Sequence, residues 1–460
     1  MKRESAEKEQ RGSRGDMPSG QVADESLYND RKAVVGIIGL GYVGIPLALA
    51  SWKAGFRVVG FDIDQSKVDT INSGASYLDH IPGQSIKVAV SSGGFRASAD
   101  FGDIRDVDAI ILCLPTPLTA HREPDLSYVE KTTHTIARYL RPGHLVILES
   151  TTWPGTTQEI MKPILEEQGL KSGRDFFLAY SPEREDPGNA DFTTETIPKI
   201  VGADDPQARR LANALYSAIV KRTVSVSSTS AAEAVKLTEN IFRAVNIALV
   251  NELKHVYAEM GINVWEVIEA ASTKPFGYMP FYPGPGLGGH CIPIDPFYLT
   301  WKAREHGIST KFIELAGEIN TAMPRLVVDK LARELDLRRG RGLRGARILI
   351  LGMSYKKNIG DTRESPSLKL MELLEDRGAR ADFYDPHIEI IPNTREHPRL
   401  AGRKGASWDP KAFPAYDVAL IATDHDSVDY KIICERIPLV IDTRNVVARR
   451  GIATNNVVRA

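Results

Sequence analysis

The feature that most constrains the fold is a glycine-rich turn set between two apolar segments near the N-terminus. Residues 33–38 (AVVGII) form an apolar run too short for a helix, and Ile45–Ala50 has the composition of one. Between them lies the sequence GLGYVG. In a strand–turn–helix unit, Gly39 makes the tight bend, Gly41 lets a pyrophosphate approach the backbone, and Gly44 lets the helix pack closely on the strand. The pattern therefore predicts the dinucleotide-binding unit of an α/β fold.

A second apolar segment supports this interpretation and indicates which dinucleotide fits. Residues 57–61 (RVVGF) predict the next strand, which ends at Asp62, 18 residues beyond Gly44. An acidic side chain at this place hydrogen-bonds a ribose hydroxyl of NAD and would repel the 2′-phosphate of NADP. NAD is therefore the predicted cofactor. The alternative is that Asp62 is an ordinary turn residue at a strand end.

Three further apolar segments predict strands that end in polar loops. They are residues 108–114, 144–148 and 176–180. Thr116, Thr151 and Glu183 follow them in turn. In an open parallel sheet the loops beyond the carboxyl ends of the strands line the ligand crevice, so these side chains are candidate site residues. For the two threonines, capping of the next turn is an equally good interpretation.

A second α/β unit is predicted in the C-terminal part of the chain. Apolar runs at 346–352, 381–386, 418–423 and 439–442 predict strands, and residues 367–376 predict a helix. The full glycine fingerprint is missing after Gly352, so this unit is expected to hold something other than the dinucleotide. In its place stands a basic loop over residues 354–366, which contains Lys356 and Arg363. Such a loop suits phosphates, and a surface charge cluster is the alternative.

Between the two units, residues 231–260 contain neither Gly nor Pro and predict one long helix. Its spacing predicts an apolar buried face made by Ile241, Val245, Leu249 and Val256. A polar stripe contains Glu233, Lys236, Asn240, Arg243 and Asn251. The stripe is either a solvated face or part of a cleft between the two α/β units. The same helix is a natural dimer surface.

One cysteine occupies a loop whose composition is unusual for a structural thiol. Cys291 follows Gly288, Gly289 and His290, and Asp295 lies four residues further on. Glycines let a backbone approach a ligand closely, so this setting favours a covalent nucleophile over inert packing. The other two cysteines, Cys113 and Cys434, lie in apolar runs typical of buried structural thiols.

The overall composition limits the partners and the compartment. The 460 residues allow roughly three domains. With 58 basic and 59 acidic side chains, no broad footprint for nucleic acid or an anionic membrane is expected. Three cysteines cannot build a disulfide framework, and no apolar run has transmembrane length, so the chain is predicted to be cytoplasmic. Residues 1–32 are too polar to order themselves and are predicted to be a disordered tail.

From about residue 33 onward the chain resembles the UDP-glucose/GDP-mannose dehydrogenase family, the UDP-sugar 6-dehydrogenases. Six separated motifs carry the resemblance and occur in the family's order: the GLGYVG turn, Ser150-Thr151, Ser181-Pro182-Glu183, Lys236 with Asn240, Gly288–Cys291 with Asp295, and Lys356–Arg363. The resemblance implies two Rossmann-like, doubly wound α/β domains joined by a long central helix that dimerises. The implied divisions are 33–228 for NAD, 229–335 for dimerisation and 336–460 for the UDP-sugar.

The resemblance also assigns roles to individual residues. The implied catalytic residues are Cys291, Lys236, Asn240, Asp295, Glu183 and Thr151. The implied cofactor contacts are Gly39, Gly41, Tyr42, Val43, Gly44, Asp62, Lys67, Thr116, Thr151 and Arg363. The implied substrate contacts are Glu183, Arg184, Lys236, Asn240, Gly288, Gly289, His290 and Lys356. No metal site is implied.

The activity implied by the resemblance is a four-electron oxidation of a UDP-sugar at C6, with NAD as acceptor and a thioester on Cys291. Residues 283–298 resemble the branch that acts on N-acetylhexosamines, and UDP-N-acetylglucosamine is the predicted substrate. The N-acetylmannosamine and N-acetylgalactosamine isomers and UDP-glucose are the alternatives. Two other classes compete: a two-electron hydroxyacid dehydrogenase, which needs no thiol, and a non-catalytic NAD-binding regulator. A homodimer or larger homo-oligomer is expected, feeding polysaccharide or glycan synthesis.

Overall fold

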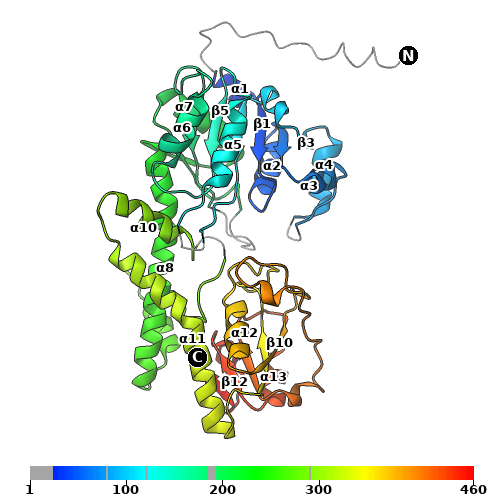
Figure 1. Ribbon diagram of the computed structural model, residues 1–460, viewed down its shortest axis with the longest axis vertical. Coiled ribbons are helices and arrows are strands. Elements are labelled where there is room, and N and C mark those ends of the chain that lie inside the picture. The colour runs from blue at the N-terminus through cyan, green and yellow to red at the C-terminus, as the bar shows by residue number, and fades with distance from the viewer. Residues whose placement is uncertain (1–23, 79–80, 120–122, 185–192, 290–291) are drawn as a thin grey trace, which may run out of the picture. The chain divides into compact units, whose positions relative to one another are not determined.

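The computed structural model describes residues 24–460 apart from 79–80, 120–122, 185–192 and 290–291 (Figure 1). The chain divides into two compact units. The first comprises Met1–Thr116, Leu126–Ser150 and Pro154–Glu233. The second comprises Pro117–Asp125, Thr151–Trp153 and Ala234–Ala460.

The first unit is built on a mixed sheet with helices packed on it (Figure 1). Its strands in the described residues are β1 (Val34–Ile38), β2 (Arg57–Phe61), β3 (Phe95–Ser98), β4 (Ala109–Leu112), β5 (Leu145–Leu148), β6 (Phe177–Tyr180), β7 (Lys199–Gly202) and β8 (Thr223–Val226). They lie in the order β3-β2-β1-β4-β5-β6-β7-β8, and the pair β6–β7 alone is antiparallel. The arrangement β3-β2-β1-β4-β5-β6 is the Rossmann order with its crevice between β1 and β4.

Seven α-helices of this unit fall in the described residues. They are α1 (Ser26–Asn29), α2 (Gly44–Lys53), α3 (Gln65–Asn72), α4 (Gly83–Ser91), α5 (Ser127–Ala137), α6 (Lys162–Glu166) and α7 (Pro206–Ile219). A short π-helix at Thr157–Met161 leads into α6. Strands β1, β4, β5 and β6 are buried along their whole length, which explains their unbroken apolar sequences.

The second unit contains a smaller parallel sheet. Its strands are β9 (Arg347–Leu351), β10 (Arg380–Tyr384), β11 (Val418–Ile421), β12 (Val440–Asp442) and β13 (Val457–Arg459), in the order β10-β9-β11-β12-β13. Its α-helices are α9 (Val264–Ser272), α10 (Asp295–Glu305), α11 (Lys311–Arg339), α12 (Pro366–Asp376), α13 (Tyr430–Arg436) and α14 (Val446–Arg449), together with most of α8 (Thr229–Glu259). The predicted α/β class with two Rossmann-like sheets is confirmed.

The long helix α8 forms as predicted, but its predicted buried face is wrong. Leu249 and Val256 are 52% and 47% exposed, and Ile241 and Val245 are only half-buried. The buried side is the polar stripe, with the exception of the exposed Arg243. Its members Glu233, Lys236, Asn240 and Asn251 are buried together with Ala244 and Ala248. Small alanines let neighbouring segments approach closely, and hydrogen bonds such as Asn251 to Asn320 on α11 satisfy the polar groups.

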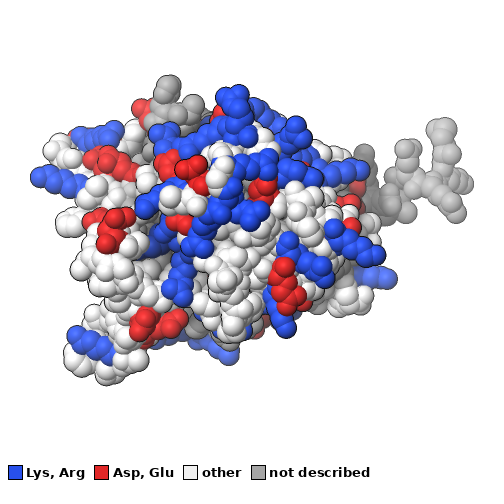
Figure 2. Space-filling model, turned by 90° about the horizontal axis from the view of Figure 1, so that it is seen from below, with Lys and Arg blue, Asp and Glu red and all other residues white. Residues whose placement is uncertain are grey.

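Charges of both signs occur on one face of the molecule. On the face shown in Figure 2, acidic side chains are interspersed among the Lys and Arg side chains. None of the helices within the described residues combines the length and the apolar character that crossing a membrane requires.

Candidate active site

The glycine turn follows β1 as predicted, and two of its three glycines are required by the chain itself. Gly39 has φ +93°, and a Cβ there would lie 2.3 Å from the carbonyl oxygen of Cys113. A Cβ on Gly44 would lie 1.9 Å from the carbonyl oxygen of Gly39, so α2 can begin there only without a side chain. A Cβ on Gly41 would have no atom of the described residues within 4 Å. The space above Gly41 is what a pyrophosphate needs, and the turn therefore fits NAD.

The carboxylate of Asp62 sits beside this turn at the end of β2. Its Oδ2 accepts a hydrogen bond from the backbone N–H of Leu40 at 3.1 Å, and its Oδ1 accepts one from that of Asp64 at 3.0 Å. Lys67 Nζ lies 3.5 Å from Oδ2. Each carboxylate oxygen can accept a second hydrogen bond, so Asp62 can also bind a ribose hydroxyl. Of the turn residues implied as cofactor contacts, Tyr42 is exposed, and Val43 is the N-cap of α2.

Replacing Asp62 by alanine is expected to lower kcat/KM for NAD by about 10- to 100-fold, because a charge-assisted hydrogen bond to the ribose is lost. The preference for NAD over NADP should shrink as well, since the repulsion of the 2′-phosphate disappears. Steady-state kinetics with both cofactors checks this. Asp64→Ala is the matched control, because Asp64 caps α3 through Ser66 and leaves Asp62 in place. An unchanged cofactor preference in Asp62→Ala would contradict the assignment.

The other loops at this edge of the sheet carry a buried ionic cluster around Glu183. Lys199 Nζ, on β7, lies 2.8 Å from Glu149 and 3.5 Å from Glu183. The hydroxyl of Tyr216 on α7 donates to the other oxygen of Glu149. Burial raises the pKa of Glu149, and the negative charge of Glu183 adds to that rise. The cluster therefore holds two carboxylates around one lysine, whose charge offsets theirs.

Three further residues predicted to contact the ligands lie in the described part of the chain. Thr116 is buried and belongs to the first unit, whereas Thr151 belongs to the second. Arg184, directly after Glu183, donates to the carbonyl oxygen of Pro198 at 2.6 Å.

In the second unit, three of the predicted catalytic residues lie together in a buried cluster. Asn240 on α8 donates from Nδ2 to Oδ2 of Asp295, the first residue of α10. Lys236 lies one turn before Asn240 and is also buried. Burial raises the pKa of Asp295 to about 7, although the charge of Lys236 and the hydrogen bond from Asn240 pull it down. A carboxyl that titrates near neutral pH is suited to act as a general base.

The glycine-rich loop before α10 packs directly on the basic loop that follows β9. The N–H of Gly289 donates to the carbonyl oxygen of Arg363 at 3.0 Å. A Cβ on Gly288 or Gly289 would come within 2.5 or 2.9 Å of the Tyr355 side chain. Both glycines are therefore needed for this contact. His290 and Cys291, the next two residues, lie outside the described residues.

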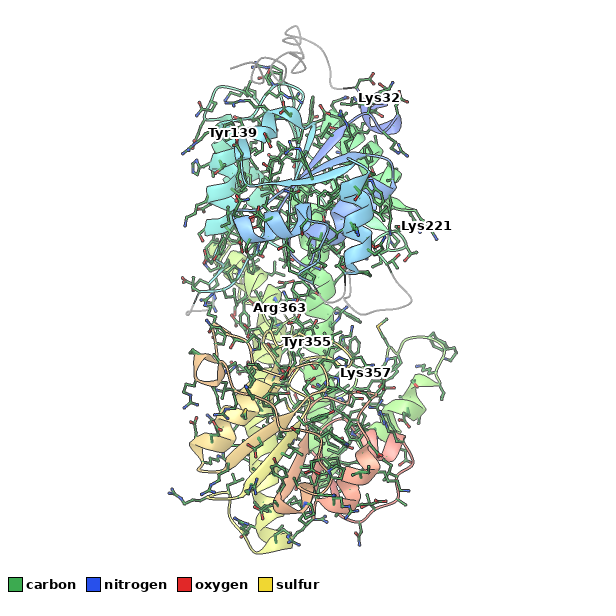
Figure 3. All side chains as sticks on the ribbon, turned by 90° about the vertical axis from the view of Figure 1, so that its right-hand side faces the viewer. Lys32, Tyr139, Lys221, Tyr355, Lys357 and Arg363 are labelled. Atoms are coloured by element: carbon green, nitrogen blue, oxygen red, sulfur yellow. The ribbon has the colours of Figure 1, made fainter. Side chains whose placement is uncertain are left out.

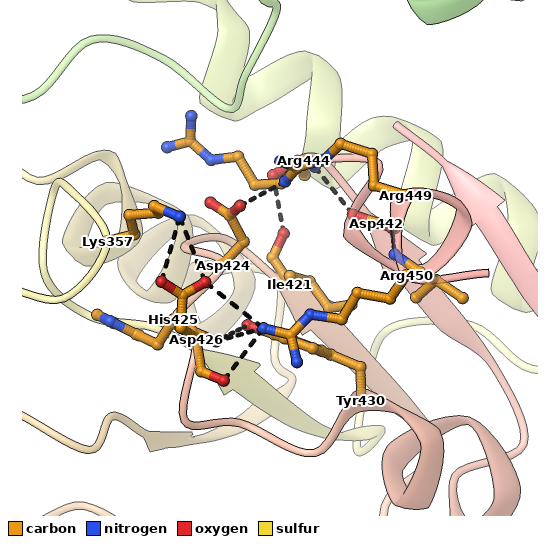
Figure 4. Close-up of polar contacts among 12 residues, drawn as sticks. Lys357, Ile421, Asp424, His425, Asp426, Tyr430, Asp442, Arg444, Arg449 and Arg450 are labelled. Atoms are coloured by element: carbon orange, nitrogen blue, oxygen red, sulfur yellow. Dashed lines mark hydrogen bonds and ion pairs between the residues drawn. The ribbon is translucent and has the colours of Figure 1, made fainter. Parts of the chain in front are cut away.

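Two residues of the basic loop form ion pairs. Arg363 pairs with Asp361 at 2.6 Å, and Lys357 pairs with Asp426 at 3.3 Å. Figure 3 shows Tyr355, Lys357 and Arg363 on this loop of the second unit, and Figure 4 shows Lys357 directed at Asp426. Lys356 is half-buried.

The sequence interpretation missed a group of cations near Gly284, in the glycine-rich segment before α10. Arg444, after β12, donates from Nε to the carbonyl oxygen of Ala422, and its Nη1 lies 2.8 Å from the Cβ position of Gly284. Lys254 on α8 is buried, and its Nζ has no hydrogen-bond partner among the described residues. Burial, then the charges of Lys330 and Arg444, lower the pKa of Lys254 to about 7. The only signal in the sequence is the position of Arg444 just beyond a strand end.

These features define a class of protein. A Rossmann unit with an NAD-type glycine turn, joined in one chain to a second Rossmann-like unit with a buried Lys–Asn–Asp cluster, is typical of a nucleotide-dependent dehydrogenase.

Comparisons with known proteins identify the family. The NAD-binding domain of the UDP-glucose/GDP-mannose dehydrogenase family matches residues 33–220, its central domain 230–322 and its UDP-binding domain 349–449. The chain belongs to this family and is an NAD-dependent UDP-sugar dehydrogenase, as the sequence predicted.

Individual relatives differ in the sugar that their names carry. A UDP-N-acetyl-D-mannosamine dehydrogenase of Pyrococcus horikoshii is 34% identical over 90% of this chain and 96% of that protein. A UDP-N-acetyl-D-glucosamine 6-dehydrogenase of Pseudomonas aeruginosa is 37% identical over 79% of this chain and 85% of that protein. Among solved structures, a UDP-D-ManNAc dehydrogenase from Pyrococcus horikoshii matches with a TM-score of 0.82 at 34% identity, over 93% of this chain and 98% of that one.

Proposed function

We propose that this enzyme oxidises UDP-N-acetyl-D-glucosamine at C6 to UDP-N-acetyl-D-glucosaminuronate, removing four electrons. The observation that carries the chemistry is the buried cluster of Lys236, Asn240 and Asp295, with Asp295 four residues beyond Cys291. A cation, an amide donor and a carboxyl of pKa about 7 are the groups that alcohol oxidation and thioester chemistry require at one centre.

The reaction then proceeds through a covalent intermediate on Cys291. When bound, NAD accepts the hydride that leaves C6 in each of the two oxidation steps. Asp295 takes the proton of the C6 alcohol in the first step, and the thiol of Cys291 adds to the resulting aldehyde as a thiohemiacetal. Loss of the second hydride leaves a thioester, which water hydrolyses to the uronate and the free thiol. The balance is RCH2OH + 2 NAD⁺ + H2O → RCOO⁻ + 2 NADH + 3 H⁺.

Lys236 and Asn240 stabilise the oxyanions that form during thiol addition and hydrolysis. Removing one such donor typically costs about 10²–10³ in kcat. Asp295 and Thr151 position the hydrolytic water, and Glu183 assists its attack. The pairing of Glu183 with Lys199 supports this role, because the lysine charge holds the carboxylate in its ionised form close to β7.

The remaining residues bind the two ligands. The NAD contacts are Gly39, Gly41, Tyr42, Val43, Gly44, Asp62, Lys67, Thr116, Thr151 and Arg363. The UDP-sugar contacts are Arg184, Gly288, Gly289, His290 and Lys356, besides the catalytic Glu183, Lys236 and Asn240. Arg444 is an additional candidate for the UDP moiety, since its guanidinium packs against Gly284 beside the loop.

The choice of sugar rests on the sequence, because residues 181–188 and 297–299 are most similar to the UDP-N-acetylglucosamine enzymes. Among the relatives, the glucosamine enzyme is 37% identical over 79% of this chain, and the mannosamine enzyme is 34% identical over 90% of it. The test compares kcat/KM for UDP-N-acetylglucosamine, its N-acetylmannosamine and N-acetylgalactosamine isomers, and UDP-glucose. The gluco-acetamido sugar should be preferred by about tenfold or more, the effect of about one unsatisfied polar group. A higher value for another sugar would move the substrate assignment and leave the chemistry unchanged.

We further propose that the enzyme is a homodimer through the outer side of α8. Phe242, Leu249 and Val256 are exposed apolar residues at helical spacing on this helix, and the exposed Met260 directly follows its last residue. A second copy of the chain would cover them. Light scattering in solution tests this, and a monomer at micromolar concentration would contradict it.

A further inference from the structure

A single buried histidine contacts both ends of the segment that carries Lys356. His425 follows β11 by four residues and is fully buried. Its Nδ1 accepts a hydrogen bond from the N–H of Asn358 at 3.0 Å. Its Nε2 lies 3.0 Å from the hydroxyl of Ser354. Lys356 is therefore the midpoint of a short turn whose two ends are bonded to one imidazole ring.

The hydrogen bonds fix the proton of this ring. Because Nδ1 accepts from Asn358, the proton resides on Nε2, which faces Ser354 and, at 3.1 Å, Oδ2 of Asp385. The Ser354 hydroxyl also donates to Oδ2 of Asp385 at 2.9 Å. Burial would raise the pKa of Asp385, but the hydrogen bonds from His425 and from backbone N–H groups lower it to about 2.

These three side chains share the residue types of a hydrolytic triad but cannot act as one. A triad histidine presents an unprotonated nitrogen to the serine hydroxyl and takes its proton. Here the unprotonated nitrogen faces the N–H of Asn358, and the serine proton already goes to Asp385. The cluster therefore holds a loop in place and performs no nucleophilic chemistry.

Neighbouring groups also hold His425 and Ser354 in place on the side of the sheet. The Tyr430 hydroxyl and Arg450 both donate to the carbonyl oxygen of His425, as Figure 4 shows. Thr423 Oγ1 donates to the carbonyl oxygen of Ser354 at 2.6 Å. Asp385 accepts from the N–H of Met353 and of Ser354 as well. The start of the loop is thus bonded to the carboxyl ends of β10 and β11.

The far end of the turn depends on fewer contacts. Asn358 has φ +61°, in the left-handed region, which asparagine adopts more readily than most residues with a side chain. Asn358 also contacts the exposed Asp426 through its side chain. Its Nδ2 donates to Oδ2 of Asp426, and its Oδ1 accepts from the N–H of Asp426. Solvent weakens that exposed pair more than the part-buried bond to His425, so the bond to His425 is the main restraint on this conformation.

We propose that His425 is a positioning residue for substrate binding: its imidazole holds residues 354 and 358 so that Lys356 is presented to the diphosphate of the UDP-sugar. The inference rests on the proposed function, in which Lys356 contacts that substrate. Arg363, the proposed NAD contact, is held separately by Asp361. Loss of His425 therefore affects UDP binding selectively.

The test measures the Kd of UDP by calorimetry, together with kcat, KM for NAD and Tm, in wild type and His425 variants. His425→Ala should weaken UDP binding about tenfold, the effect of losing one to two buried hydrogen bonds. kcat at saturating UDP-sugar and KM for NAD should stay within about twofold. His425→Asn should recover part of the UDP affinity, because its amide oxygen can replace Nδ1 as acceptor for Asn358.

Tyr416→Phe is the matched control, since it removes one hydrogen bond, to Asp382, elsewhere in the same sheet. It should leave UDP binding unchanged. If His425→Ala does not fold, the comparison of His425→Asn with His425→Gln replaces it, with the weaker UDP binding expected for Gln. Equal UDP affinity in wild type and the His425 variants would overturn the inference alone. A wild-type enzyme that binds no UDP would overturn the proposed function and the inference together.

Discussion

Replacing Cys291 by serine is expected to lower uronate formation by at least about 10³-fold, because the second oxidation needs a thiol adduct. A serine hydroxyl is a far weaker nucleophile at neutral pH. An ester would also hydrolyse more slowly than a thioester. The first oxidation uses Asp295 and NAD and does not require the thiol, so aldehyde-level product should appear in place of uronate. Mass spectrometry of the products measures both species.

The matched control for Cys291 is Cys434→Ser. Cys434 is buried on α13, and burial raises the pKa of its thiol to about 11, so it stays protonated and inert at neutral pH. This variant should make uronate at close to the wild-type rate. Full uronate production by Cys291→Ser would instead remove the covalent step from the mechanism.

Replacing Lys236 by methionine should lower kcat by about 10²–10³, because a cation that stabilises the oxyanions is lost. It should also shift the pH dependence. Asp295 must be ionised to act as a base, so wild-type activity should rise with pH through about 7. Lys236 lowers the pKa of Asp295, and without it the pKa rises further. The rise in activity of the variant should therefore occur at a higher pH, as a pH–rate profile would show.

Lys302→Met is a suitable control for this change. Lys302 is also a buried lysine but lies on α10, where it pairs with Glu305 of the same helix at 2.9 Å. It should alter stability more than the pH profile. If activity rises at the same pH in Lys236→Met and in wild type, Asp295 is not the base in catalysis.

The parts of the fold that follow from local sequence were predictable. The strand, glycine turn, helix and Asp62 at the next strand end lie within 29 residues from Val34 onward, and each has its own signal. The short strands β3, β7, β8 and β13 were not predicted. Each has three or four residues, and β7 begins with Lys199, whose charge is neutralised by carboxylates distant in sequence. Nothing near Lys199 in the chain indicates that pairing.

The error on α8 has a similar cause. Hydrophobic periodicity assumes that apolar residues are buried and polar residues exposed. Here Asn251 bonds Asn320 and Gly284, and Asn240 bonds Asp295, so the polar side faces inward. The apolar residues Leu249 and Val256 remain on the surface of the single chain.

The candidate site could be proposed from the sequence one residue at a time, but its network of contacts could not. Its motifs are marked by residue type and position at strand ends, which a sequence displays. The partners that set their chemistry are not marked. Glu149 and Lys199 are 50 residues apart, and Ser354 and His425 are 71 apart. Their hydrogen bonds depend on which strands are neighbours in the sheet, which no local pattern specifies.

The most direct test of the central claim is the number of NADH molecules released for each UDP-N-acetylglucosamine consumed. The proposed reaction requires two, because the alcohol passes through an aldehyde to a carboxylate at one carbon. A value of two, with uronate as the product, is the predicted result. A value of one, with a stable carbonyl product, would contradict the thioester mechanism and return Cys291 to a structural role.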